Sequence, residues 1–265
     1  MERKFGLKIP EIKQSDYRFG ASLPFVCYQP TGQWDDYLPK KEYQCNNFVE
    51  SQACTSFGTI AATTALIKRV LGDNVEFSER FLAKNSGTDP QDGGNDPHKV
   101  AESLRKDGVV FQGRWDFTDE IKSVEEFYSE IPAEVFRFAT KDFNYSLKHE
   151  YVGTDIFSIK KALQSSTIGF SVHAWQSDEN GIYHKPAGCT DNHWVMVYGY
   201  DDEKKAWKVF DSYDAGGSNL KLYSYESIPS IAKRYAIEKG FPKKKVWFVD
   251  LLSRLYRFFL DILFK

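Results

Sequence analysis

The feature that most constrains the fold of this chain is a change in the spacing of its apolar side chains. Between residues 53 and 71 they recur at helical spacing, and the run stops at Gly72, a residue typical of helix C-termini. After about residue 150 the spacing changes to alternation, which is typical of strands. The alternation is clearest in three segments, 168–175, 193–200 and 207–210. A helical half followed by a strand-forming half predicts an α+β fold with two lobes and a cleft between them.

The first half contains further helix signals separated by a polar loop. Ser78 is a candidate N-cap for a short helix that continues through Leu82. The polar, glycine-containing segment 85–97 predicts a loop, and helical character resumes at 99–105. We therefore expect residues 54–145 to be mostly helix and loop.

These patterns predict one domain over residues 1–245, followed by a separate C-terminal segment. The expected bounds within the domain are 1–49 for an extended lead-in, about 50–145 for a helical lobe and about 150–245 for a β lobe. Residues 246–265 are largely apolar, with charged residues at spacings of three and four. That spacing predicts an amphipathic helix rather than a membrane span.

Three roles for this C-terminal helix stay open. Its apolar face would pack onto the domain, or dock on a partner or a second copy of the chain. The three lysines at 243–245 immediately before it would also suit a helix that lies on a membrane surface.

The composition limits the partners and the cellular setting of the chain. Its 35 basic and 37 acidic side chains give a net charge of −2, which predicts no attraction to nucleic acid. The N-terminus lacks the apolar stretch of a secretory signal, and no segment reaches the about 18 uncharged apolar residues of a membrane span. Four scattered cysteines are too few for a disulfide framework. We therefore expect reduced thiols and a cytoplasmic setting in a cell or host cell, or association with a virion.

Three residues provide the side chains that a reaction of a thiolate with an acyl group requires. Cys54 opens the helical run, His193 opens an alternating segment 139 positions later, and Asp211 follows 18 positions after the histidine. Each alone has an ordinary structural explanation, since a cysteine in a helix is more often a small buried apolar residue. Their order and setting together favour a nucleophile, a base and an orienting carboxylate.

The start of a helix suits the nucleophile because a thiol must ionise before it attacks. The positive end of the helix dipole and a neighbouring imidazolium both stabilise a thiolate at Cys54. His193 then protonates the leaving amine and later activates water, while Asp211 holds the other ring nitrogen. This chemistry needs no cofactor and no metal, and the chain has no C-x₂-C pair of the kind that binds zinc.

The neighbourhoods of these residues resemble papain-like cysteine peptidases. Residues 54–61 look like the helix that carries the nucleophile in that family, and residues 78–82 look like the short helix that follows it. Residues 92–95 are similar to its paired glycines, and residues 211–213 take the place of its Asn-Ser-Trp sequence. The separation of the cysteine and the histidine also lies in the range of about 130–150 residues found in papain-type enzymes. The resemblance covers roughly residues 34–215.

The resemblance implies a two-lobed papain-like fold and a cysteine-type peptidase with a peptide or protein substrate. It further implies that Gly93, Gly94 and Asn192 lie along that substrate.

The donor for the developing oxyanion has two candidates. In the family a glutamine lies six positions before the cysteine, whereas here Gln52 is two positions before it and Gln44 is ten before it. We favour Gln44, reached through a four-residue insertion, because Leu38-Pro39 ahead of it resembles the lead-in of the family. The backbone N–H of Cys54 would supply the second donor.

Alternatives to a papain-type peptidase stay open. The family's Cys-Gly-Ser before the nucleophile is missing, which indicates a divergent branch of viral or bacterial type. Residues 193–196 together with 209–211 also resemble the double-glycine peptidases of the same superfamily. A transglutaminase-like acyltransferase would use the same three residues to pass the acyl group to an amine. A papain-fold protein that no longer cleaves and serves a binding or structural role is the remaining alternative.

Overall fold

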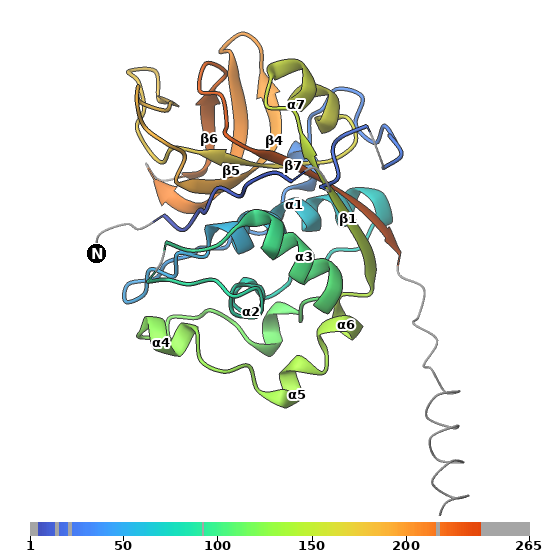
Figure 1. Cartoon of the computed structure of the whole chain (residues 1–265), viewed down its shortest axis with the longest axis vertical. Helices are drawn as coiled ribbons and strands as arrows, with labels where there is room; N and C mark the ends of the chain where they lie inside the picture. Colours follow the sequence, from blue (N-terminus) through green and yellow to red (C-terminus); the bar gives the residue numbers. More distant parts are fainter. Residues whose placement is uncertain (1–4, 14–15, 21–22, 92, 216–217, 240–265) are drawn as a thin grey trace, which may run out of the picture.

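The structure is a computed structural model and describes residues 5–13, 16–20, 23–91, 93–215 and 218–239. It confirms the predicted α+β fold, and Figure 1 shows most of the helices below a seven-stranded sheet. The amphipathic helix predicted for residues 246–265 lies outside the described residues. In the part of the chain that is described, no helix has the length and apolar character to cross a membrane.

The first half of the chain is helical, as its apolar spacing predicts. The long helix α1 spans Cys54–Leu71, and shorter helices follow it with loops between them. Their bounds are α2 Glu79–Asn85, α3 Pro97–Asp107, α4 Val124–Phe127, α5 Ala133–Phe136 and α6 Ala139–Asp142, with 3₁₀ turns η1 at Asp35–Tyr37 and η2 at Gln112–Arg114. Both predicted end signals are confirmed. The Ser78 side chain accepts from the backbone N–H of Phe81, and Gly72 ends α1 in the left-handed conformation at φ 74°.

The second half forms one sheet with the strand order β1-β7-β2-β4-β5-β6-β3. The strands are β1 Tyr145–Val152, β2 Ile168–Val172, β3 Ile182–Tyr183, β4 His193–Asp201, β5 Ala206–Ala215, β6 Ser218–Ser224 and β7 Ala232–Lys239. Among these described strands, β3 runs parallel to β6 and every other pair is antiparallel. The three alternating segments of the sequence become β2, β4 and β5, so this prediction is confirmed.

Helix α7 and the strands β1 and β7 were not predicted from the sequence. Helix α7 spans Ile156–Leu163, and the Asp155 side chain caps it by accepting from the backbone N–H of Ser158. Strand β1 pairs with β7 along its whole length, from Tyr145 opposite Lys239 to Val152 opposite Ala232. Partners so far apart in the sequence are selected by tertiary packing, which local spacing does not report.

Helix α1 is the central element because it packs against both halves. It contacts β4 and β7 of the sheet and α2 and α3 on the helical side, and its first fourteen residues are all buried.

The close approach of α1 to β4 depends on Trp194, whose indole lies against two glycines. A Cβ at Gly58 would lie 2.8 Å from Trp194 Cδ1, and one at Gly169 would lie 2.5 Å from Cζ2. The two glycines therefore let the start of α1 lie beside the start of β4.

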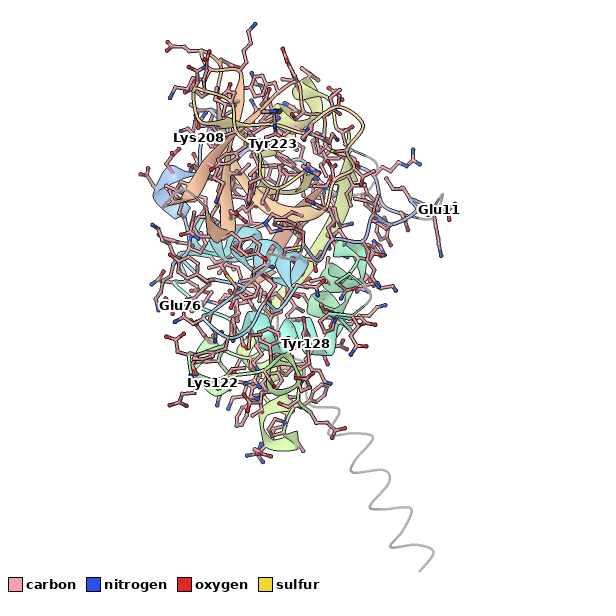
Figure 2. All side chains as sticks on the ribbon, turned by 90° about the vertical axis from the view of Figure 1, so that its left-hand side faces the viewer. Glu11, Glu76, Lys122, Tyr128, Lys208 and Tyr223 are labelled. Atoms are coloured by element: carbon pink, nitrogen blue, oxygen red, sulfur yellow. The ribbon has the colours of Figure 1, made fainter. Side chains whose placement is uncertain are left out.

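The turn before α1 is held from the helical side. Tyr128, labelled in Figure 2, follows α4 and donates its hydroxyl to the backbone carbonyl of Ser51 at 2.6 Å. Ser51 donates its own hydroxyl to the backbone carbonyl of Gln44 at 2.7 Å. These partly or fully buried hydrogen bonds fix the path by which the chain enters the helix at Cys54.

Candidate active site

Cys54 is the first residue of α1, and its side chain is fully buried. Ala53 occupies the N-cap position, so no side chain caps this end of the helix. A helix start carries a partial positive charge from its unpaired N–H groups, which favours a negative charge in the first turn. The position therefore suits a thiolate.

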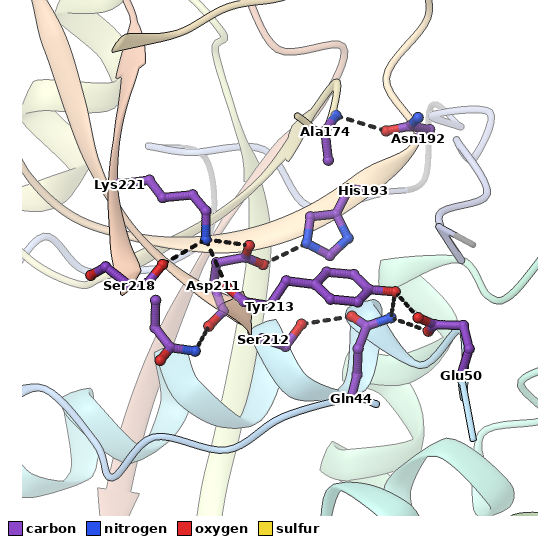
Figure 3. Close-up of polar contacts among 11 residues, drawn as sticks. Gln44, Glu50, Ala174, Asn192, His193, Asp211, Ser212, Tyr213, Ser218 and Lys221 are labelled. Carbon is purple, nitrogen blue, oxygen red and sulfur yellow. Dashed lines mark hydrogen bonds and ion pairs between the residues drawn. The ribbon is translucent and has the colours of Figure 1, made fainter. Parts of the chain in front are cut away.

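His193 and Asp211 face each other from adjacent strands. His193 is the first residue of β4, and Asp211 lies in β5, which pairs antiparallel with β4. His193 Nε2 donates to Asp211 Oδ1 at 2.6 Å, and both side chains are buried, as Figure 3 shows. The other ring nitrogen, Nδ1, is buried and has no nitrogen or oxygen partner within the described residues. It is therefore the nitrogen available to the Cys54 thiol, which interacts with the ring.

The charges around His193 favour its protonated form. Burial by itself lowers the pKa of the imidazole, but Asp211 and Cys54 outweigh burial and raise the pKa to about 9. Burial raises the pKa of Asp211, but His193 and Lys221 outweigh burial and hold that pKa below its usual range. At neutral pH the site therefore contains an imidazolium that faces a carboxylate on one side and the thiol on the other.

Lys221 on β6 is a third member of this charged group that the sequence did not reveal. Its ammonium donates to Asp211 Oδ2 at 2.9 Å, and its side chain is 1% exposed. It also donates to the backbone carbonyls of Tyr213 at 2.7 Å and Ser218 at 3.0 Å. On the same strand, Asn219 donates to the backbone carbonyl of Asp211 at 2.8 Å. Strand β6 thus fixes the carboxylate that orients His193.

A buried hydrogen-bond network lies next to the histidine. The ring of Tyr213 packs against the ring of His193 with 5.4 Å between centroids. Its hydroxyl donates to Glu50 and accepts from the amide of Gln44 at 3.0 Å. The same amide donates to Glu50 Oε1 at 3.0 Å, and Ser212 donates to Gln44 Oε1 at 2.6 Å. Figure 3 shows the phenol, the amide and the carboxylate converging on one point.

Glu50 is a further buried carboxyl of the site that was not predicted. Burial raises its pKa, while hydrogen bonds from Tyr213 and Gln44 and the charge of His193 oppose that rise. A single glutamate or lysine carries no spacing signal, so neither Glu50 nor Lys221 could be distinguished from surface charges in the sequence.

Both candidate oxyanion glutamines lie near the start of α1, but they have different partners. Gln44 is fully buried, and both hydrogens of its amide are engaged by Glu50 and Tyr213. Gln52 has a left-handed backbone at φ 54°, and its amide donates to the backbone carbonyl of Pro90. Gln44 is thus tied to the residues around the histidine, and Gln52 is tied to the loop that carries the paired glycines.

The predicted substrate-binding residues lie on both sides of a short N-terminal segment. Gly94 forms a tight turn at φ 89°, in which its N–H donates to the backbone carbonyl of Asp89 at 2.7 Å, and Gly93 precedes it at φ 73°. Asn192 immediately precedes β4, and its Oδ1 accepts from the backbone N–H of Ala174 at 2.9 Å.

Residues 5–8, named here the Phe5–Lys8 segment, run between the sheet and the helices (Figure 1). On one side, the N–H of Asn95 donates to the carbonyl of Gly6 at 2.9 Å, and the N–H of Lys8 donates to the carbonyl of Asn95 at 2.8 Å. On the other side, the N–H of Leu7 donates to the carbonyl of Asn192 at 3.3 Å. The segment therefore bridges the loop of the paired glycines and the start of β4.

The side chains of the Phe5–Lys8 segment contact two of the three predicted catalytic residues, His193 and Cys54. The ring of Phe5 lies 5.4 Å from the ring of His193 between centroids. Leu7 packs in an apolar cluster with Cys54, Trp194 and Ile231. The sequence predicts only an extended lead-in here, because four residues without periodicity carry no signal of where they dock.

The four cysteines form no disulfide with one another in the part of the chain that the structure describes. All four cysteines are reduced thiols, and Cys27 and Cys189 are exposed. Within the described ranges, no group of three or more His, Cys, Asp or Glu residues is placed to hold a metal ion.

The fold is shared with solved cysteine proteases. Xylellain, a cysteine protease from Xylella fastidiosa, is 19% identical with a TM-score of 0.64, and the match covers 91% of this chain and 98% of xylellain. Digestive procathepsin L2 from the larval midgut of Tenebrio molitor is 14% identical with a TM-score of 0.65, covering 88% of this chain and 78% of that protein. Bromelain from Ananas comosus, solved with the inhibitor E64, is 18% identical with a TM-score of 0.59, covering 78% and 98%.

No protein-family model and no curated protein matches the sequence. The structural likeness at these low identities shows the fold alone. The expected papain-like fold is therefore confirmed, while the assignment to a viral or bacterial branch stays a prediction.

Proposed function

We propose that this papain-fold chain is a cysteine-type peptidase that hydrolyses peptide or isopeptide bonds through a thioester acyl-enzyme. Cys54 is the nucleophile, His193 the acid and base, and Asp211 the orienting carboxylate. The observation that carries the proposal is the buried 2.6 Å pair of His193 and Asp211, whose histidine pKa is raised both by that carboxylate and by Cys54 at the start of α1.

In the first half of the reaction, the Cys54 thiolate attacks the substrate carbonyl carbon and a carbon–sulfur bond forms. The imidazolium of His193 then gives its proton to the leaving amine, and the carbon–nitrogen bond breaks. The products of this half are a free amine, a thioester on Cys54 and a neutral imidazole.

In the second half, the neutral imidazole of His193 removes a proton from water, and the hydroxide attacks the thioester carbonyl. The carbon–sulfur bond breaks, which releases a carboxylic acid and restores the thiolate and the imidazolium. Asp211 keeps the ring oriented throughout, because its Oδ1 holds Nε2 and leaves Nδ1 toward the sulfur.

The negative charge on the carbonyl oxygen needs donors in both halves. The backbone N–H of Cys54 and the amide of Gln44 are the proposed donors. Gln44 would exchange one of its present amide hydrogen bonds, to Glu50 or to Tyr213, for the oxyanion.

The test is to trap the acyl-enzyme with peptide esters on the full chain and on the full chain with Leu7→Asp, in which the side chain that packs on the thiol is replaced, and to locate the adduct by mass spectrometry. We expect a thioester at Cys54 and hydrolysis of peptides, with both lost in Cys54→Ala and His193→Ala. Cys189→Ala is the matched control, because this exposed thiol lies outside the site, and it should behave as the wild type.

The competing functions give different results in the same experiment. Transfer of the acyl group to an added amine in preference to water would identify an acyltransferase. A folded protein that forms no adduct at Cys54 with any acyl donor, in the wild type and in Leu7→Asp, would identify a non-catalytic role. The Leu7→Asp variant is included because Leu7 packs against the thiol.

A further inference from the structure

The amide of Gln44 could point either its oxygen or its N–H groups at its neighbours, and Glu50 decides between the two. The amide nitrogen lies 3.0 Å from Glu50 Oε1, and an ionised carboxylate can only accept hydrogen bonds. The amide oxygen accepts from the Ser212 hydroxyl at 2.6 Å. A hydroxyl can donate or accept, so Ser212 by itself would tolerate either orientation. The orientation of the Gln44 amide therefore depends on Glu50.

The hydrogen bonds of Glu50 are those of an ionised carboxyl group. Its Oε1 accepts from the Gln44 amide and from the backbone N–H of Gln52 at 3.2 Å, and its Oε2 accepts from the Tyr213 hydroxyl. All three of these partners donate to the carboxyl, as an acceptor-only group requires. The residue is 7% exposed, so these protein groups and not bulk solvent surround the charge.

The two amide hydrogens of Gln44 have partners of unequal strength. One is donated to the Glu50 carboxylate and the other to the Tyr213 hydroxyl, each at 3.0 Å between the heavy atoms. A hydrogen bond to an ionised acceptor is roughly twice as strong as one between neutral groups. When an oxyanion develops, the hydrogen donated to Tyr213 is therefore the one that can be released. Tyr213 keeps its other hydrogen bond, because its hydroxyl donates to Glu50.

The hydrogen donated to Tyr213 is also the one directed at the reacting groups. Burial raises the pKa of the Tyr213 hydroxyl most, and the charges of Glu50 and Cys54 raise it further, so the hydroxyl lies close enough to the sulfur to interact with it. The ring of Tyr213 packs against His193. A hydrogen released from this hydroxyl is therefore near the place where the substrate carbonyl must react.

We infer that Glu50 is a positioning residue of this site, whose carboxylate holds one N–H of Gln44 so that the other N–H is presented to the oxyanion. This inference rests on the proposed peptidase function and adds the residue that prepares its oxyanion donor. Glu50 itself touches no reacting atom in this role, and it acts only through Gln44.

The first experiment measures hydrolysis of a peptidyl p-nitrophenyl ester by Glu50→Gln. All proteins are the full chain with Leu7→Asp, because Leu7 packs on the thiol. A glutamine at this position can donate as well as accept, so the Gln44 amide can turn its oxygen toward the oxyanion. We expect kcat to fall by about 10–100-fold with little change in KM, because the lost hydrogen bond forms only as charge develops. An unchanged kcat overturns the inference.

Asp142→Asn is the matched control, because it also neutralises a buried carboxylate. Asp142 accepts from Arg114 and from the backbone N–H of Phe111, and neither belongs to the site. This variant should lose stability in urea unfolding and keep its kcat. A fall in kcat equal to that of Glu50→Gln would show that the loss of any buried carboxylate has this effect.

A double-mutant cycle separates positioning from a merely structural role. If Glu50 acts through Gln44, then Glu50→Gln added to Gln44→Ala should lower kcat by less than about twofold further. Independent effects that multiply would show that Glu50 does not act through this amide, and would overturn the inference.

A third measurement needs no turnover. The side-chain amide protons of Gln44 can be assigned by NMR from their loss in Gln44→Ala. One of them should be shifted downfield by the carboxylate, and this shift should be lost in Glu50→Gln and kept in Asp142→Asn. An amide signal that does not respond to Glu50→Gln overturns the inference.

The two proposals fail in distinguishable ways. Multiplying effects in the cycle, with the thioester at Cys54 intact, refute the role of Glu50 and leave the peptidase standing. A Gln44 signal that responds to Glu50→Gln, in a protein that forms no thioester with any acyl donor, refutes the peptidase and with it the role of Glu50 in its reaction.

Discussion

His193 and Lys221 donate to opposite oxygens of one carboxylate, that of Asp211, at 2.6 and 2.9 Å. All three side chains are buried, so two cationic groups share one anion inside the protein. Cys54 interacts with the other side of the His193 ring and, like Asp211, raises the pKa of that histidine. The arrangement makes the stability of the fold and the charge state of the site depend on each other.

Removing the ammonium of Lys221 should destabilise the protein strongly. In Lys221→Met the carboxylate of Asp211 loses a buried ionic partner, and breaking such a pair costs about 3–5 kcal/mol. Lys208→Met is the control, because Lys208 lies at the surface in Figure 2 and pairs with a half-exposed Asp35. That surface pair contributes at most about 1 kcal/mol. Urea unfolding of both variants measures the difference, and equal losses would show that the buried pair adds nothing.

The stability of the protein should fall at alkaline pH because of His193. Its pKa rises from the ordinary 6.5 to about 9 in the folded state, so folding favours the protonated ring. That contribution is fully present below about pH 6.5 and is lost as pH rises through 9, with a total of roughly 3 kcal/mol. Urea unfolding at pH 6 and at pH 9.5 should show this loss in the wild type and much less of it in Asp211→Asn. An identical pH dependence in both proteins would disprove the coupling.

The pair of His193 and Asp211 should also determine the pH at which activity declines on the alkaline side. The imidazolium is the acid that protonates the leaving amine, so kcat/KM should decline as pH rises through about 9. Asp211→Asn removes the charge that contributes most to raising the pKa of His193. This decline in activity should therefore shift to lower pH by more than one unit. A pH–rate profile of the variant that superimposes on that of the wild type would exclude Asp211 from this role.

Kinetic measurements should show which glutamine, Gln44 or Gln52, is the oxyanion donor. If Gln44 is the oxyanion donor, Gln44→Ala should lower kcat by about 10²-fold with little change in KM, because the bond forms only as charge develops. Gln52→Ala is the comparison, and its main effect should be on the loop held through Pro90. A larger loss of kcat in Gln52→Ala would reverse the assignment.

Gly58 should be sensitive to the addition of a single methyl group. In Gly58→Ala the new Cβ would lie 2.8 Å from Trp194 Cδ1 and 3.2 Å from its backbone carbonyl oxygen, so α1 must move away from β4. We expect a loss of about 1–3 kcal/mol in the free energy of unfolding. Activity should fall as well, because Cys54 begins this helix and His193 begins that strand. Gly113→Ala, in open space, should change neither property.

The parts of the fold that local spacing determines could be predicted from the sequence. Helix α1, the cap at Ser78 and the strands β2, β4 and β5 each follow from a periodicity or a capping residue within a few positions. Strands β1 and β7 and helix α7 could not be predicted in this way. Their existence depends on which distant surfaces they cover.

The candidate site likewise contains residues that local sequence signals predict and residues that they do not. The sequence predicts Cys54, His193 and Asp211 because their residue types begin or follow recognisable elements, and the structure brings them close to one another. Lys221 and Glu50 reach the site through pairing and burial, which one sequence does not encode locally. The Phe5–Lys8 segment is the extreme case, since its position follows only from the shape of the surface that receives it.

The course of the Phe5–Lys8 segment, between the loop of the paired glycines and the start of β4, provides a starting point for the design of an inhibitor. A ligand that copies this segment would place its phenyl ring against His193 and its leucine side chain against Cys54. A short peptide with this sequence should therefore compete with substrates for the site. The chain itself thus contains the template for a competitive antagonist of its own site.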